Sequence, residues 1–313
     1  MTNLSEFTFL SSDGKTQLHG MLWEPEGVAV RAVLQICHGV AEHIARYDGF
    51  ARALNEQGIV VAGHDHLGHG KSLPEGGTPV YFGDGNTWNT VVDDIYILHQ
   101  RLKQRYPDAP LCIMGHSMGS FLTRTYLIRY PGTVKAAVIM GTGWQPQAAI
   151  TGGLALANAI AAVSGENATS ELVTELAFGS YNKLFAPNRT KVDWLSADES
   201  NVDDYIADPL CGADATVGLF RQMLHGIRFN QRQSHLRQMD REMPVLFVAG
   251  DKDPVGSCGK GVRQTYDAFR AAGMRDCTLK LYPGLRHEIL NEKAYTADIT
   301  KNIEAWLLSR LEK

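Results

Sequence analysis

Short apolar runs alternate along the chain with longer stretches of helical periodicity. The apolar runs cover residues 32–37, 59–62, 111–114, 134–140, 245–249 and 278–281. Runs of this length predict strands that are buried on both faces, as in a parallel sheet. The stretches between them predict helices at 47–57, 91–102, 118–129 and 299–307. Near the N-terminus, residues 7–10 and 17–23 flank a Ser-Asp-Gly turn and predict a pair of strands.

Strands that alternate with helices predict an α/β fold, a mostly parallel eight-stranded sheet flanked by helices. Residues 144–236 break the alternation, because they contain no strand pattern and begin with a small apolar stretch. The chain therefore divides into a first core part (1–143), an inserted helical segment (144–236) and a second core part (237–313). The insertion is expected either to cap a site at the carboxyl ends of the strands or simply to pack on the sheet.

Composition and charge narrow the function only in part. The 313 residues are 44% hydrophobic and 20% charged, which is typical of a globular protein with a large core. The formal net charge of -4 argues against a nucleic-acid partner. The five cysteines are scattered, without the paired spacing of a metal site, and indicate free thiols in a reducing compartment. Residues 1–20 contain no apolar signal-peptide core, so we expect a cytoplasmic protein.

The most informative motif is Gly-His-Ser-Met-Gly at 115–119, which follows a predicted strand and begins a predicted helix. In this context the motif predicts a nucleophile elbow, with Ser117 on a strained turn. Gly115 and Gly119 remove the Cβ atoms that would clash in such a turn. The neighbouring His116 is expected to point back beneath the elbow and to pack rather than to react.

A serine hydroxyl needs a base to activate it, and the base needs an acid to orient it. His287 follows the predicted strand 278–281, and Asp251 and Asp253 follow the predicted strand 245–249. These loops lie at the carboxyl ends of their strands, in the chain order Ser, Asp, His that an α/β hydrolase requires. Asp253 is favoured as the acid, because Asp251 directly follows a glycine and could instead shape the turn.

The negative oxygen of a tetrahedral intermediate needs two preorganised donors. The backbone amide of Met118 is one candidate. The second is the amide of Val40, which follows Gly39 at the end of the predicted strand 32–37, where glycine allows close backbone approach. The alternative for this stretch is a turn that merely ends the strand.

A histidine-rich stretch, His-Asp-His-Leu-Gly-His at 64–69, suggests a metal site at first sight. It is similar to the signature of metallo-β-lactamase-like hydrolases, but Gly68 stands where that signature has an aspartate. No later pair of ligands is evident in the sequence. We therefore expect no metal here. We interpret the stretch as a loop beside the turn that follows the predicted strand 32–37 and carries Gly39 and Val40, which we call the oxyanion turn.

Taken together, these motifs resemble those of α/β-hydrolase-fold serine hydrolases of the monoacylglycerol lipase and lysophospholipase group. The resembling stretches are His-Gly-Val-Ala-Glu-His at 38–43, Arg-Tyr at 46–47, Asp-His-Leu-Gly-His-Gly-Lys-Ser at 65–72, the elbow at 115–119, Gly-Asp-Lys-Asp at 250–253 and Pro-Gly-Leu-Arg-His-Glu at 283–288. The resemblance implies a triad of Ser117, Asp253 and His287, oxyanion amides at Val40 and Met118, a helical cap at the insertion, and no cofactor.

The resemblance further implies hydrolysis of carboxylic esters of single-acyl lipids, monoacylglycerol or lysophospholipid, through an acyl-enzyme on Ser117. The alternatives are a short-chain carboxylesterase, a serine peptidase on the same scaffold, and a non-catalytic ligand-binding protein. The expected partner is a small ester with an acyl chain. Apolar residues of the insertion are expected either to line an acyl channel or to pack the insertion on the core: Ala148, Ala149, Ile150, Leu154, Leu156, Ile160 and Val163. They also permit transient contact with a membrane surface, although a basic face is lacking.

Overall fold

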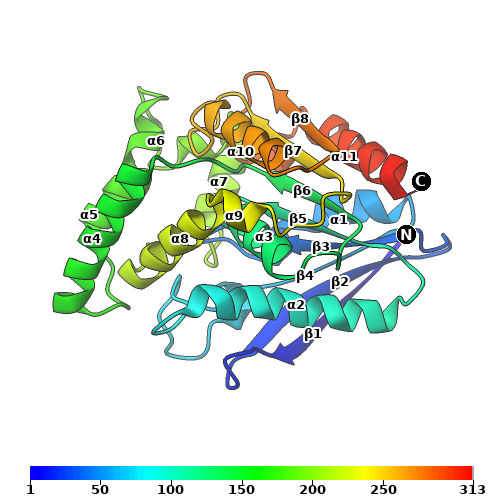
Figure 1. Cartoon of the computed structure of the whole chain (residues 1–313), viewed down its shortest axis with the longest axis horizontal. Coiled ribbons are helices and arrows are strands. Elements are labelled where there is room, and N and C mark those ends of the chain that lie inside the picture. Colours follow the sequence, from blue (N-terminus) through cyan, green and yellow to red (C-terminus); the bar gives the residue numbers. More distant parts are fainter. Residues whose placement is uncertain (312–313) are drawn as a thin grey trace.

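Eight strands form one sheet in the order β1-β2-β4-β3-β5-β6-β7-β8 (Figure 1). The computed structural model describes residues 1–311; residues 312–313, the end of the predicted second core part, lie outside the described residues. The strands are β1 (Thr2–Leu10), β2 (Gln17–Pro25), β3 (Ala32–Cys37), β4 (Ile59–His64), β5 (Leu111–His116), β6 (Ala136–Met140), β7 (Val245–Gly250) and β8 (Cys277–Tyr282). Only the pairings of β2 with β1 and with β4 are antiparallel. The predicted, mostly parallel eight-stranded sheet is confirmed.

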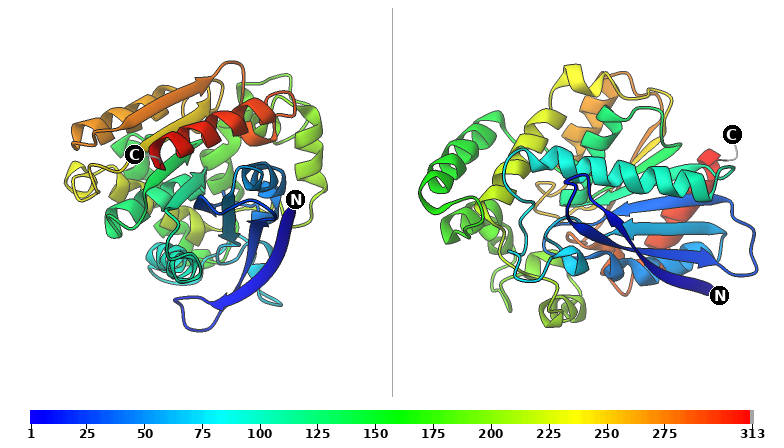
Figure 2. Two further views of the ribbon diagram at one scale, coloured as in Figure 1. Left: turned by 90° about the vertical axis from the view of Figure 1, so that its right-hand side faces the viewer. Right: turned by 90° about the horizontal axis from the view of Figure 1, so that it is seen from below.

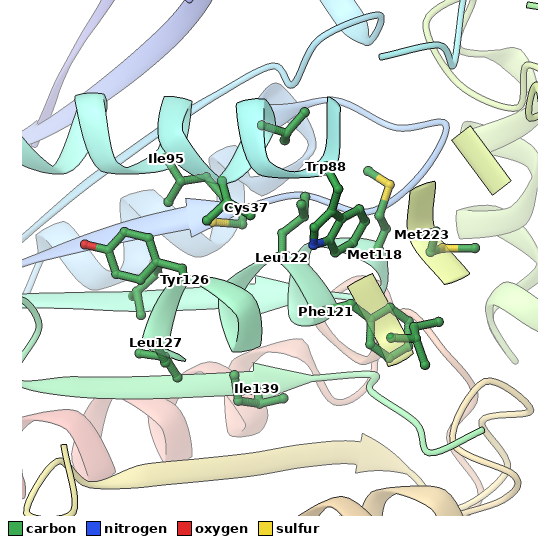
Figure 3. Packing of buried hydrophobic residues seen from close by; sticks show 14 of the residues in the cluster. Cys37, Trp88, Ile95, Met118, Phe121, Leu122, Tyr126, Leu127, Ile139 and Met223 are labelled. Carbon is green, nitrogen blue, oxygen red and sulfur yellow. The ribbon is translucent and has the colours of Figure 1, made fainter. Parts of the chain in front are cut away.

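Helices cover both faces of this sheet. They are α1 (Asp48–Asn55), α2 (Thr87–Arg105), α3 (Met118–Arg129), α10 (Lys260–Ala271) and α11 (Thr296–Leu311). Successive side chains of a strand point to opposite faces, and the buried residues therefore separate into two clusters. One joins the sheet to α2, α3 and α10, and the other joins it to α1 and α11. Figure 3 shows the first cluster, in which Cys37 of β3, Ile95 of α2 and Leu122 of α3 meet.

The bounds of β3 and α3 agree with the sequence prediction, whereas those of most other elements differ by a few residues. The largest difference among the strands is β1, which begins at Thr2 although the prediction started it at residue 7, because residues 3–6 are exposed and mostly polar. The β1–β2 ribbon lies along one edge of the molecule (Figure 2). Helix α10 escaped prediction because its buried residues are few and separated by charged ones.

Between β6 and β7 the described chain is helical except for one isolated bridge, Thr169 to Thr216. The α-helices there are α4 (Gln147–Ser164), α5 (Glu171–Thr174), α6 (Ser180–Lys183), α7 (Glu199–Ala207), α8 (Val217–Asn230) and α9 (Gln233–Leu236); a π-helix covers Glu175–Gly179 and a 3-10 turn covers Asp193–Leu195. Helix α8 packs on both α3 and α4. As a result, α4 and α5 lie at the side of the molecule opposite the two termini (Figure 1).

Helix α4 differs from the other described helices in its composition. Of the described helices, it alone is long and apolar enough to cross a membrane, with a mean hydropathy of 1.3. Only 17% of that stretch is buried inside the protein. Its buried residues, Ile150, Leu154 and Ala157, lie on one side. The remainder of the helix presents small and apolar side chains to the surroundings.

Candidate active site

Ser117 stands between β5 and α3 in a backbone conformation that side chains rarely adopt, with φ 54° and ψ -122°. Its amide donates to the carbonyl of Met140 at 3.1 Å, which ties the turn to β6. The flanking glycines are required by space. A Cβ atom at Gly115 would collide with the carbonyl of Gly119, and one at Gly119 would collide with the carbonyl of Cys37. This is the strained strand-to-helix turn that the motif predicts.

His287 and Asp253 form a buried pair beside this turn. Nδ1 of His287 lies 3.0 Å from Oδ1 of Asp253, and the two residues are 2% and 0% exposed. The amide of Val255 donates to the same carboxylate oxygen at 2.9 Å and fixes its orientation. Nε2 of His287 has no hydrogen-bond partner in residues 1–311. The ring centroid of His287 is 4.7 Å from that of His116, the residue before Ser117.

Asp251, the other candidate acid, is engaged elsewhere. Its Oδ1 accepts a hydrogen bond from the amide of Gly284 at 2.8 Å, and its own amide donates to the carbonyl of Tyr282 at 3.0 Å. Asp251 therefore joins the loop after β7 to the turn after β8. The structure brings Asp253, and not Asp251, to His287.

The turn after β3 passes close over Ser117. A Cβ atom on Gly39 would stand 3.1 Å from Cβ of Ser117, so a larger residue would crowd the serine. Two residues on, Ala41 has a left-handed backbone with φ 52°. Within the described chain, the amides of Val40 and Met118 donate to no protein acceptor. Neither predicted oxyanion donor is therefore engaged by another group of the described chain.

A buried network of charged groups lies beneath the oxyanion turn. Oε1 of Glu42 accepts from Nδ1 of His116 and from the hydroxyl of Tyr47, each at 3.1 Å. Arg46 donates to Oε2 of Glu42 at 3.2 Å and to both oxygens of Glu288 at 2.6 and 2.8 Å. Glu288 follows His287 directly, so the network links the loop of the base to the oxyanion turn. These residues stand in the motifs of the sequence analysis, but no role is predicted for them there. The signal that could have revealed them is a Glu and an Arg four positions apart in a motif rich in apolar residues.

His116 has a more specific position than the packing role predicted for it. Nδ1 faces Glu42, and Nε2 lies 3.3 Å from the backbone carbonyl of His287. Burial opposes the charged ring, but the hydrogen bond and charge of Glu42 outweigh it, so the pKa of His116 is raised. Burial likewise opposes the charge on Glu42, yet His116 and Arg46 hold the pKa of that carboxyl well below its ordinary value. His116 thus connects the oxyanion turn to the base.

The histidine-rich stretch at 64–69 lies next to the oxyanion turn. The amide of His66 donates to Nε2 of His38 at 2.9 Å, and Asp65 accepts from the amide of Ile44 at 2.8 Å. Burial lowers the pKa of His64 to about 3, so its ring is neutral. Among the described residues, these histidines do not converge as a set of metal ligands. Their hydrogen bonds attach one loop to the other.

The insertion contributes an aromatic cover to the base. The ring of Trp194 lies 5.1 Å from that of His287, and Tyr181 packs edge-on against Trp194 at 5.2 Å. The amide of Glu288 donates to the carbonyl of Leu195 at 2.7 Å, which joins the 3-10 turn to the loop of the base. These contacts were not predictable, because no local pattern marks a tryptophan about 90 residues before the histidine that it covers.

A second part of the insertion, residues 205–212, is attached to the oxyanion turn. The carbonyl of Ala41 accepts from the hydroxyl of Tyr205 and from the amide of Gly212, both at 3.0 Å. His43 Nε2 and Asp208 Oδ2 lie 2.8 Å apart in the same contact. The insertion therefore touches both the base and the oxyanion turn.

The apolar residues of α4 occupy two kinds of position. Ile150 and Leu154 are buried in the cluster that includes α8, which is the packing alternative. Val163 is 88% exposed and Ala148 is exposed as well, so neither lines an interior channel or packs the insertion on the core. For these two residues both alternatives are wrong.

A surface cavity of ≈ 440 Å³ is not lined by Ser117 or His287. It is lined by the start of α2, by α8 with Arg221, His225 and Arg228, and by Arg232. Ser117 itself is only 9% exposed. Ser117, Asp253 and His287 are therefore all buried. The candidate site is identified by the types and arrangement of these residues, not by the size of a cavity.

A strained serine after the fifth strand, a buried His–Asp pair after the last two strands, and two free amides define an α/β hydrolase. Comparison with known proteins agrees. Residues 28–294 match the sequence model of the family described as serine aminopeptidase, S33, and the chain belongs to that family.

Several relatives match over nearly the full length. The chain is 31% identical to a monoacylglycerol lipase of Mycolicibacterium smegmatis over 98% of each chain, and 28% identical to a monoglyceride lipase of Mus musculus over 96% of this chain and 90% of the relative. Among solved structures, a thermostable carboxyl esterase from Bacillus coagulans superposes with a TM-score of 0.92 at 26% identity, covering 99% of this chain and 100% of the other. The protein is similar to ester hydrolases throughout its length.

Proposed function

We propose that the protein is a serine hydrolase that cleaves carboxylic esters of lipids with a single acyl chain, monoacylglycerol or lysophospholipid. The reaction would proceed through an acyl-enzyme on Ser117. The observation that carries this proposal is the buried Asp253–His287 pair, whose Nε2 has no hydrogen-bond partner in residues 1–311, together with the strained backbone of Ser117. The relatives named monoacylglycerol lipase support the class of substrate.

In the first step, His287 Nε2 takes the proton of Ser117 as its oxygen attacks the ester carbonyl. The carbonyl electrons move onto oxygen, which the amides of Val40 and Met118 stabilise. Asp253 accepts from Nδ1 of His287, holds the ring orientation and stabilises its charged form. The intermediate collapses when the C–O bond to the alcohol breaks and His287 protonates the leaving alcohol.

In the second step, water attacks the acyl-enzyme and His287 takes the proton of that water. The same two amides stabilise the second oxyanion. The bond to Ser117 breaks, its oxygen takes the proton back from His287, and the carboxylic acid leaves. Each group returns to its starting state, and the residues that perform the steps come from this chain alone.

We assign residues 144–236 to a cap, which covers a core made of residues 1–143 and 237–313. Support comes from the contacts of the insertion, because Trp194 lies on His287 and Tyr205 bonds to Ala41. A segment that contacts both the base and the oxyanion turn is placed to control access of the acyl chain.

The exposed apolar helix α4 supports transient contact of this cap with a membrane surface. We place the protein in the cytoplasm, since its five cysteines, unpaired in the structure, suit a reducing compartment. Failure to co-sediment with phospholipid vesicles under conditions where long-chain esters are cleaved would remove the membrane contact from the proposal.

The alternatives are a short-chain carboxylesterase and a serine peptidase. An aminopeptidase must recognise a substrate ammonium, for which a carboxylate near the serine is the natural group. The carboxylates of the buried network, Glu42 and Glu288, are both bound by Arg46, and Asp253 is bound to His287. This engagement favours ester substrates over peptides with a free N-terminus.

The test is hydrolysis of p-nitrophenyl esters from acetate to palmitate by the wild type and by Ser117→Ala, followed by monoacylglycerol and lysophosphatidylcholine. Activity that peaks at medium or long chains and disappears in the variant is the expected result. Activity confined to acetate and butyrate would replace the lipid substrate with a short-chain ester. Equal traces of activity in both proteins would contradict the enzyme proposal altogether.

A further inference from the structure

Three groups that prefer to bind transition metals converge where the insertion meets the oxyanion turn. They are Nε2 of His43, a carboxylate oxygen of Asp208 and Sγ of Cys211, and these atoms all lie within 4.8 Å of one another. His43 is buried, with its side chain 10% exposed, whereas that of Asp208 is 29% exposed. One ligand thus comes from the core and two come from the insertion, with access from solvent on the side of Asp208.

The local backbone brings the two ligands of the insertion together. Asp208 ends helix α7, and its carbonyl accepts from the amide of Cys211 at 3.0 Å, which turns the chain back on itself. The amide of Leu210 donates to Oδ1 of Asp208 at 2.9 Å. Oδ1 is therefore held, and Oδ2 is directed at His43, 2.8 Å away. The two ligand atoms are therefore neighbours without an ion.

The charged groups around the site are paired with one another, apart from Asp208. Arg46 donates to Glu42 and to both oxygens of Glu288, and His116 donates to Glu42. The carboxylate of Asp208 lies next to the thiol of Cys211. An ion would have to displace the thiol proton.

We propose that His43, Asp208 and Cys211 form a binding site for a zinc-class divalent ion that staples the insertion to the oxyanion turn. Imidazole nitrogen, carboxylate oxygen and thiolate are the ligands of Zn²⁺, whereas Mg²⁺ and Ca²⁺ require oxygen. Three protein ligands leave the fourth tetrahedral position to water. On binding, the ion takes the place of the proton between Nε2 of His43 and Asp208, that proton moves to Nδ1 of the neutral imidazole, and the thiol proton of Cys211 passes to solvent.

The staple would strengthen contacts that the structure already has. Ala41, two residues before His43, is held by Tyr205 and Gly212, which flank the other two ligands. An ion that joins residue 43 to residues 208 and 211 spans the same junction. Because it binds only the folded chain, it should raise the melting temperature as its concentration rises. This expectation does not depend on the proposed hydrolase activity.

The experiment is a Co²⁺ titration of the full chain after treatment with a chelator, with Zn²⁺ added afterwards as a competitor. We expect one ion per chain, a thiolate-to-cobalt charge-transfer band that Zn²⁺ abolishes, and a higher melting temperature with Zn²⁺. Cys211→Ser should abolish the band, and both Cys211→Ser and His43→Gln should weaken binding by about tenfold or more. Cys258→Ser, which changes an exposed cysteine elsewhere, is the matched control and should bind as the wild type does.

A second measurement on the wild type keeps the test decisive if a variant fails to fold. Alkylation of each cysteine is followed by mass spectrometry with and without Zn²⁺, and Cys211 should be protected while Cys258 is not. The absence of a charge-transfer band, binding unchanged in the variants, or alkylation of Cys211 unaffected by Zn²⁺ would each overturn the proposal.

Discussion

Helices α3 and α4 follow neighbouring strands of one sheet and are both rich in apolar residues, yet their surroundings differ completely. Eleven residues of α3 are buried, from Met118 to Ile128, whereas α4 buries three, Ile150, Leu154 and Ala157. The sheet, α2 and α8 enclose α3, but α4 rests on α8. Residues at the start of α3 are therefore fixed by packing against the sheet, α2 and α8. The apolar side chains of α4 are instead exposed, where a partner or a substrate can contact them.

The largest effect should come from the acid of the core. Asp253→Asn would leave the fold intact but lose the carboxylate that orients His287, and kcat should fall by about 10⁴-fold. Steady-state hydrolysis of a p-nitrophenyl ester measures this loss. Asp251→Asn is the matched control, because Asp251 bonds only to a neighbouring turn, and its kcat should stay near that of the wild type. A similar loss in both variants would mean that the two aspartates act through folding.

Stability should separate the two helices next. Leu122→Ala in α3 removes a fully buried side chain and should lower the free energy of unfolding by about 2–5 kcal/mol. Val163→Ala in α4 changes an exposed side chain and should stay within about 0.5 kcal/mol of the wild type. Urea unfolding of the three proteins gives both values. Comparable losses at both positions would show that α4 is covered in solution, by a partner or by a second copy of the chain.

A smaller effect should appear in the pH dependence of stability. The folded pKa of His116 is raised above its ordinary value of 6.5. Its charged form therefore stabilises the protein fully below about pH 6.5, and this contribution is lost as the pH rises through the folded pKa. The difference in the free energy of unfolding between wild type and His116→Gln should shrink as the pH increases from 5.5 to 9. A difference that does not change with pH would mean that His116 is neutral in the folded protein.

What the sequence predicted well was local. The apolar run 32–37 and the helix 118–129 are recognisable because their residues are buried by elements that the alternating pattern itself implies. The elbow follows from five consecutive residues, and the chain order of Ser117, Asp253 and His287 places them at one edge of a parallel sheet. Here the local sequence determines the turn at Ser117, and the right-handed connections between parallel strands determine the edge of the sheet at which the three residues lie.

What the sequence could not give depends on contacts between distant segments. Arg46 and Glu288 are separated by 242 positions, and neither lies in a pattern that points to the other. Trp194 contacts His287 from the helical insertion, and the hydrophobic periodicity of the insertion does not predict how its chain runs over the core. The role of His116 was missed for the same reason, because its partner Glu42 enters from another strand end. Such contacts arise from tertiary packing and become visible only in the fold.

The most direct test of the central claim is the reaction of the protein with a fluorophosphonate probe, followed by intact mass and peptide mass spectrometry. The account predicts one adduct per chain, on the peptide that contains Ser117, and a much slower reaction in His287→Gln because the serine loses its base. No adduct on the folded wild-type protein, or an adduct on another residue, would contradict the assignment of Ser117 as the nucleophile.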